Sequence, residues 1–228
     1  MEREDRKNLI ISGSLFLVFI IYTLLVRFVD VQAIGPQGSS VGFAALNGAA
    51  AKIFPYNGFW YLLSKIVGYF AILLCLCFIA TAVMQLIRGK SLKKVDRQLV
   101  VLLAFYVAII FFYLFFEVVI INYRPVLKDG VLEASYPSTH TLLACCSFIS
   151  AASQVRIRRF SSAKTISIVL YVLTAVLVLS RMFSGVHWLT DILGGVLLSA
   201  ALLSGYFTAL KIVDRNARRK RKNNSSKS

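Results

Sequence analysis

Residues 99–116 read LVVLLAFYVAIIFFYLFF and contain no Asp, Glu, Lys or Arg. The hydrocarbon core of a bilayer is about 30 Å thick, and a helix needs roughly 20 apolar residues to cross it. Buried helices of soluble proteins rarely run this long without a charge. Similar charge-free blocks occupy residues 9–26, 66–87, 138–155, 165–180 and 192–210.

These blocks predict an all-α integral membrane protein. Helices are required because lipid offers no hydrogen-bond partner to the backbone, and the blocks are too long for the tilted strands of a membrane barrel. The composition agrees, with 58% hydrophobic and 16% charged residues. A single domain, 1–228, is expected to hold six transmembrane helices at about 9–29, 59–87, 99–121, 138–155, 165–183 and 187–210, followed by a basic cytoplasmic tail at 211–228.

The distribution of basic residues predicts the orientation in the membrane. The formal net charge is +16, and most of the 26 Lys and Arg residues lie at the N-terminus and in segments 88–97, 156–164 and 211–227. A six-helix arrangement places these segments on one side, which the positive-inside rule assigns to the cytoplasm. We therefore expect both termini in the cytoplasm and the first helix retained as a signal anchor in the cell membrane. The charge is explained by topology and attraction to anionic lipid, so no nucleic-acid partner is expected.

The sequence contains only two histidines, and each lies at the external end of a predicted helix. His187 and Asp191 are spaced i and i+4, which places them on one face of a helix. The carboxylate of Asp191 can accept a hydrogen bond from one imidazole nitrogen and leave the other nitrogen free as a nucleophile. A structural His–Asp contact is the alternative interpretation.

Other residues at the same membrane face suit an anion. Ser138 and His140 open the fourth helix, where free backbone N–H groups and the helix dipole favour negative charge. Arg124 and Arg181 offer guanidinium groups that bind phosphate in a bidentate manner. Separately these features fit a capped helix or interfacial anchors, but together they predict a phosphate site at the non-cytoplasmic ends of helices 3–6.

The spacing of these residues resembles the type 2 phosphatidic acid phosphatase superfamily. That signature consists of a lysine followed by Arg-Pro, then Pro-Ser-Gly-His, then Ser-Arg with His and Asp downstream. The chain matches it with Arg124-Pro125, Pro137-Ser138-Thr139-His140 and Ser180-Arg181 with His187 and Asp191. The resemblance covers residues 117–191, and the first helices are similar to those of the Gram-positive bacterial type.

The resemblance implies a metal-independent enzyme without a cofactor. His187 is the implied nucleophile, Asp191 orients it, and His140 protonates the leaving group. The implied phosphate-binding residues are Arg124, Arg181, Ser138 and Thr139, the last through backbone N–H groups.

Two departures from the signature concern the site. Thr139 replaces the usual glycine, and Glu117 occupies the position of the lysine. Glu117 is expected to modulate the site by pairing with Arg124, by remaining protonated or by favouring a substrate that bears a cation. Lys128 is the expected replacement for the missing positive charge.

The leading hypothesis is dephosphorylation of a lipid phosphate or pyrophosphate in the bilayer, at the external face. Candidate substrate classes are undecaprenyl pyrophosphate, phosphatidic acid and phosphatidylglycerol phosphate. In the leading hypothesis the phosphoryl group passes through a phosphohistidine on His187 to water. One alternative is a lipid phosphotransferase, which uses this intermediate but passes the phosphoryl group to another acceptor. The other is a non-catalytic lipid-binding or transport protein, which Glu117 favours. The sequence leaves the lipid and the oligomeric state open.

Overall fold

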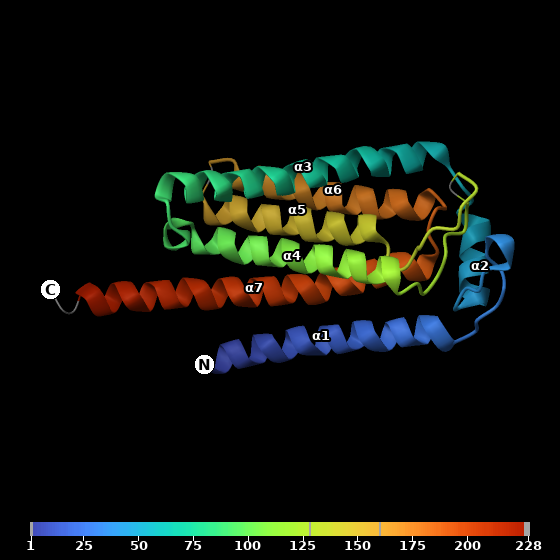
Figure 1. The fold of residues 1–228 in the computed structure, drawn as a ribbon, viewed down its shortest axis with the longest axis horizontal. Helices are drawn as coiled ribbons and strands as arrows, with labels where there is room; N and C mark the ends of the chain where they lie inside the picture. Colours follow the sequence, from blue (N-terminus) through green and yellow to red (C-terminus); the bar gives the residue numbers. More distant parts are fainter. Residues whose placement is uncertain (1, 128, 160, 226–228) are drawn as a thin grey trace.

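The computed structural model describes residues 2–127, 129–159 and 161–225, and their regular structure is helical apart from isolated β-bridges (Figure 1). The α-helices are α1 Arg3–Phe28, α2 Ala44–Ile53, α3 Gly58–Gly89, α4 Arg97–Val118, α5 Thr139–Ile157, α6 Ala163–Phe183 and α7 Leu189–Ser225, and two short 3-10 helices lie at Pro36–Gly38 and Leu92–Lys94.

The long helices lie side by side as a bundle, and α2 lies across one end of it (Figure 1). Helix α5 packs against α3, α4, α6 and α7, while α1 packs mainly on α7. Two clusters of buried apolar side chains fill the spaces between these helices, one of them centred on Leu99, Leu102 and Leu198 and the other on Ala144, Phe148 and Leu177.

Five helices are long and apolar enough to cross a membrane, namely α1, α3, α4, α6 and α7. The sixth expected helix is present as α5, but it does not meet that criterion. It carries the fully buried polar side chains Ser147, Ser150 and Gln154. Because the neighbouring helices cover it, these groups find protein partners, as when Gln154 Nε2 donates to Tyr206 Oη at 2.9 Å. The interior position of α5 thus accounts for its lower hydropathy.

Three expected helix boundaries are corrected. Helix α4 ends at Val118, three residues before the predicted limit, and α7 begins at Leu189, after His187. Helix α7 also continues through the predicted basic tail to Ser225. The N-terminal segment helps to hold this extension, because Arg215 forms ion pairs with Glu2 and Asp5.

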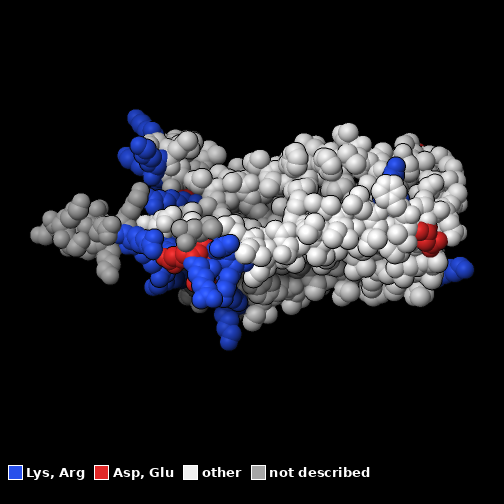
Figure 2. All heavy atoms as spheres, turned by 90° about the horizontal axis from the view of Figure 1, so that it is seen from below, with Lys and Arg blue, Asp and Glu red and all other residues white. Residues whose placement is uncertain are grey.

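The two ends of the bundle differ in charge. Lys and Arg side chains gather mostly at the end that carries both termini and the α3–α4 and α5–α6 connections (Figures 1 and 2). The opposite end carries α2, the α4–α5 connection and the short α6–α7 connection. The predicted phosphate-site residues belong to this second end.

Candidate active site

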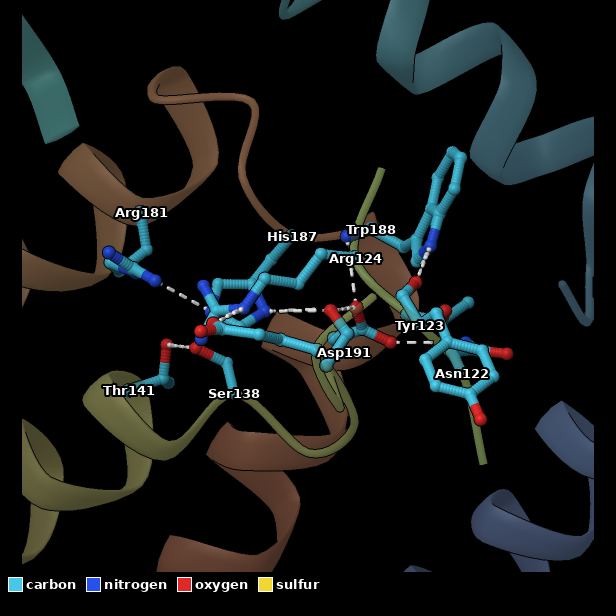
Figure 3. Close-up of polar contacts among 12 residues, drawn as sticks. Asn122, Tyr123, Arg124, Ser138, Thr141, Arg181, His187, Trp188 and Asp191 are labelled. Carbon is cyan, nitrogen blue, oxygen red and sulfur yellow. Dashed lines mark hydrogen bonds and ion pairs between the residues drawn. The ribbon is translucent and has the colours of Figure 1, made fainter. Parts of the chain in front are cut away.

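Four segments meet at the end of the bundle opposite the termini (Figure 3). They are the α4–α5 connection (119–138), the first turn of α5, the α6–α7 connection (184–188) with its flanking turns, and the first turns of α3. Glycines of α7 permit the close approach, since a Cβ at Gly194 would lie 2.5 Å from the Tyr136 ring and one at Gly195 would lie 2.9 Å from the Ser138 carbonyl oxygen. Substitution of either glycine is therefore expected to push the α4–α5 connection away from α7.

His187 lies in the α6–α7 connection with only 6% of its surface exposed. Its Nε2 atom lies 2.7 Å from Nη2 of Arg181. A guanidinium group can only donate hydrogen bonds, so Nε2 must be the acceptor. The neutral ring then carries its hydrogen on Nδ1, which lies 3.0 Å from the hydroxyl of Ser135. This tautomer leaves the lone pair on Nε2, directed at Arg181.

Ser135 lies between His187 and Asp191. Its hydroxyl accepts from Nδ1 of His187 and donates to Oδ2 of Asp191 at 2.5 Å. The direct separation of Nδ1 and Oδ2 is 3.8 Å, too long for a hydrogen bond. The predicted direct contact was therefore wrong. The spacing rule assumed that both residues were helical, whereas α7 begins at Leu189.

Asp191 is fully buried, and hydrogen-bond donors surround its carboxylate. Oδ1 accepts from Nδ2 of Asn122 at 3.1 Å. Oδ2 accepts from the backbone N–H of Trp188 at 3.0 Å, in addition to Ser135. A buried carboxylate with three donors has its desolvation compensated and its position fixed. Asp191 is thus a rigid anchor at the start of α7.

Arg181, in the last turn of α6, is also fully buried. Its Nη1 donates to Ser64 Oγ at 3.1 Å, and its guanidinium carbon lies 5.7 Å from the centre of the Tyr61 ring. Helix α3 therefore supports the arginine, which the sequence motifs did not indicate. Among the described residues, Nε of Arg181 has no hydrogen-bond partner. The side chain thus retains a donor for an incoming anion.

One nitrogen of Arg124 forms an ion pair with an acidic side chain of the same connection. Its Nε lies 3.1 Å from Oε2 of Glu133, and its backbone N–H donates to the Glu133 carbonyl at 3.1 Å. An isolated bridge between Tyr123 and Ala134 brings the two strands of this connection together. The sequence predicted Arg124 as a phosphate ligand but missed the acid beside it.

The first turn of α5 lies against the same site. Ser138 occupies the N-cap position, but its hydroxyl accepts from Thr141 Oγ1 at 3.1 Å and makes no capping hydrogen bond. The first-turn N–H groups have no acceptor within the helix. The Ser138 N–H donates to the Asp191 carbonyl at 2.9 Å, which ties α5 to α7. Thr139 begins α5, so the position requires no backbone conformation that is special to glycine.

His140 lies in the same turn, with its ring next to Gly68 of α3, where an added Cβ would lie 3.4 Å from Cδ2. Burial in the first place, and the nearby guanidinium groups of Arg181 and Arg124 in the second, lower the pKa of His187 well below its usual range. His187 is therefore neutral near pH 7, with its Nε2 lone pair intact.

Of the two predicted modulators, the structure describes only Glu117. Glu117 is exposed in the last turn of α4, and within the described part of the chain no ion pair joins it to Arg124. Of the three expectations for Glu117, pairing with Arg124 is therefore wrong, because Glu133 takes that place. Lys128 lies outside the described residues.

An open groove of about 270 Å³ adjoins the site. Its lining is mostly aromatic and aliphatic, with Arg124 as the charged member, and consists of Tyr56, Tyr61, Arg124, Val126, Leu127 and Val186. Across residues 2–127, 129–159 and 161–225, no three or more His, Cys, Asp or Glu side chains are placed to share a metal ion. The arrangement therefore combines a buried imidazole, guanidinium groups and an apolar groove.

Part of the chain matches a known family, and its fold matches a solved structure. Residues 119–213 match the PAP2 superfamily, which confirms the resemblance predicted from the sequence. The fold is similar to the crystal structure of the first transmembrane PAP2 type phosphatidylglycerolphosphate phosphatase from Bacillus subtilis, with a TM-score of 0.61 and 18% identity over 90% of this chain and 96% of that one. No curated protein sequence matches the chain.

Proposed function

Residues 119–213 carry the PAP2 superfamily region, and from this we propose that the chain is a membrane phosphatase that hydrolyses a lipid phosphate or pyrophosphate through a phosphohistidine intermediate on His187. The observation that carries the proposal is the 2.7 Å contact between the buried His187 Nε2 and Arg181. A neutral imidazole whose lone pair faces a guanidinium is arranged for attack on a phosphorus atom whose oxygens that guanidinium binds.

In the first chemical step, Nε2 of His187 attacks phosphorus while the bond from phosphorus to the leaving oxygen breaks. Arg181 turns its donors from Nε2 to the phosphoryl oxygens, and its buried Nε supplies a further one. The first-turn N–H groups of α5 and the side chain of Ser138 contribute to the same pocket. Arg124 joins when it releases Glu133. His140 donates a proton to the leaving oxygen.

In the second step, water attacks the phosphohistidine. His140, which gave up its proton in the first step, is the group that accepts a proton from this water. The P–N bond breaks, inorganic phosphate leaves, and Nε2 regains its lone pair and the contact with Arg181. Asp191 holds the imidazole in place through the Ser135 hydroxyl during both steps. The cycle uses only side chains of this chain and needs no metal.

The substrate is proposed to be amphipathic. The groove beside Arg124 is apolar along most of its lining, so it suits the first methylenes or isoprenoid units next to a phosphorylated head group. Undecaprenyl pyrophosphate, phosphatidic acid and phosphatidylglycerol phosphate all have this form. The basic end of the bundle is proposed to face the cytoplasm, which puts the site on the external side of the cell membrane.

The test is release of inorganic phosphate by the purified full chain in detergent. The panel contains the three lipid classes, with EDTA present throughout. We expect phosphate release from at least one lipid, and loss of release by at least 1,000-fold in His187→Gln, as is typical when a nucleophile is removed.

A second readout detects the intermediate. Acid-labile, base-stable ³²P label on the chain after a quench is expected for the wild type and absent for His187→Gln. If both proteins are folded and neither releases phosphate from any lipid, the phosphatase proposal is wrong. Release that persists in His187→Gln would assign the nucleophile elsewhere.

A further inference from the structure

We propose that Ser135 is a positioning residue that couples His187 to Asp191, so that the proposed catalytic unit is His–Ser–Asp and not His–Asp. The inference rests on the proposed function, because it assigns a role within the same reaction. None of the three sequence motifs includes Ser135. The geometry points to it independently of them.

The distances leave no direct route from the ring to the carboxylate. Nδ1 of His187 and Oδ2 of Asp191 are 3.8 Å apart, whereas the Ser135 hydroxyl lies 3.0 Å from the first and 2.5 Å from the second. With the hydrogen on Nδ1, each group donates to the next: Nδ1–H to Oγ, then Oγ–H to the carboxylate. Because Arg181 must donate to Nε2, the Nδ1 hydrogen faces Ser135, whose backbone also accepts a hydrogen bond from the ring.

The chain of donors matters most when the nucleophile is phosphorylated. Attack by Nε2 forms the N–P bond, the bond to the leaving oxygen breaks, and the ring becomes an N-phosphorylated imidazolium that keeps its Nδ1 hydrogen. The positive charge of that ring strengthens the hydrogen bond to Ser135 and, through it, the bond to Asp191. Ser135 thus stabilises the charged intermediate more than the resting ring, and no proton needs to leave Nδ1.

The backbone holds Ser135 where this role requires it. The residue is 2% exposed, and its N–H donates to the Asn122 carbonyl at 2.9 Å. Asn122 in turn donates from its side chain to Oδ1 of Asp191. The side chain of Ser135 thus bonds directly to the Asp191 carboxylate, and its backbone is linked to the same carboxylate through Asn122. Such support is expected of residues that orient a reacting group without touching the substrate.

The first experiment observes the hydrogen bond without using activity. The chain has only two histidines, so His140→Gln protein labelled with ¹⁵N-histidine gives the signal of His187 alone. We expect a downfield Nδ1–H proton that exchanges slowly with water. In His140→Gln/Ser135→Ala this proton should move upfield and exchange at least tenfold faster. An unchanged signal would overturn the proposal whatever the enzyme's activity.

The second experiment uses the isosteric pair Ser135→Thr and Ser135→Val, which add the same bulk but differ in the hydroxyl. With lipid phosphate as substrate, we expect Val to lower kcat by about 10- to 100-fold while Thr keeps most of it, with KM little changed in both. Ser199→Ala is the matched control, since Ser199 is also 2% exposed and donates to the Gly195 carbonyl of α7, away from His187 and Asp191.

The outcomes separate the two proposals. If the wild type releases phosphate and Ser135→Val retains full kcat, Ser135 has no positioning role and the phosphatase proposal stands. If Val and Thr lose kcat equally, the serine is needed only for packing, which also overturns the inference. If the wild type is inactive but the Nδ1–H signal depends on Ser135, the phosphatase proposal fails and the coupling remains.

Discussion

Arg181 and His187 are in contact through Nη2 and Nε2, 2.7 Å apart in an interior from which water is largely excluded. Arg181 thus donates a hydrogen bond to Nε2, the nitrogen proposed to attack phosphorus. A phosphoryl group entering the site offers the guanidinium a better, charged acceptor and frees the lone pair. Burial, and then the charge of this guanidinium, lower the pKa of His187 and favour the unprotonated ring. In the proposed mechanism, binding of the substrate therefore also frees the Nε2 lone pair.

The first prediction concerns this contact. Arg181→Lys keeps one charge but loses the planar group that reaches both His187 and Ser64. We expect kcat to fall by about 100- to 1,000-fold, the range for loss of a donor to a transition-state oxygen. Steady-state phosphate release measures it. The matched control is Arg156→Lys. Arg156 also donates a hydrogen bond to a serine, Ser167, but it lies at the basic end of the bundle, away from the site. An equal loss in both variants would contradict the prediction.

The second prediction concerns the ion pair between Arg124 and Glu133, whose facing atoms are 3.1 Å apart. If phosphate must compete with this carboxylate for Arg124, Glu133→Gln should bind anions more tightly. A partly exposed pair is worth about 0.2–1 kcal/mol, which corresponds to an approximately 1.4- to fivefold lower KM and a similarly lower inhibition constant for orthovanadate. Both constants are read from initial rates.

Glu117→Gln is the control for this prediction, since it removes an acidic charge from the exposed end of α4. We expect no change in either constant. Should Glu117→Gln tighten vanadate binding and Glu133→Gln leave it unchanged, the substrate would be sensing the acid predicted from the sequence and not the one found beside Arg124.

Much of the bundle was predictable from the sequence, because lipid allows a long apolar segment few conformations. All six expected helices are present, and their limits agree within a few residues, except that α1 begins at Arg3 and α7 continues through the basic end to Ser225. The candidate site residues were predictable for a different reason. Few polar groups occur near the apolar blocks, so His187, Asp191 and Arg181 were conspicuous in the sequence. They lie together, as the motif spacing indicated.

What the sequence did not indicate are the contacts made by ordinary residues in connections. Ser135, Asn122 and Glu133 lie in a segment with no periodicity, and their roles depend on how that segment folds back on itself at the Tyr123–Ala134 bridge. Ser64 is one of many serines in apolar helices. The only signals in the sequence were Ser135, which belongs to none of the three motifs, and Asn122, which lies beside Arg124-Pro125. Serine and asparagine are too common at such positions to indicate a role.

A third prediction follows from the lowered pKa of His187. The native state holds this ring neutral, whereas the unfolded chain protonates it below about pH 6.5. Acidification from pH 7 to pH 5 therefore favours unfolding, with a limiting slope of about 1.4 kcal/mol per pH unit below 6.5 for this single group. Thermal unfolding in detergent should show a smaller acid-induced loss of Tm in His187→Gln. Parallel pH curves for the two proteins would show that the folded ring titrates normally.

The last prediction concerns the membrane crossing of α5, which is less apolar than its neighbours. If α5 crosses, the connections before and after it lie on opposite sides, with the basic one inside. Val131→Cys and Ser161→Cys place an exposed thiol in each connection. A background lacking Cys75, Cys77, Cys145 and Cys146, which are all free thiols, avoids interference. In intact cells a membrane-impermeant maleimide should label Val131→Cys alone, and Ser161→Cys should react only after permeabilisation. Labelling of both in intact cells would mean that α5 does not span the bilayer, whereas the reverse pattern would place the proposed site in the cytoplasm.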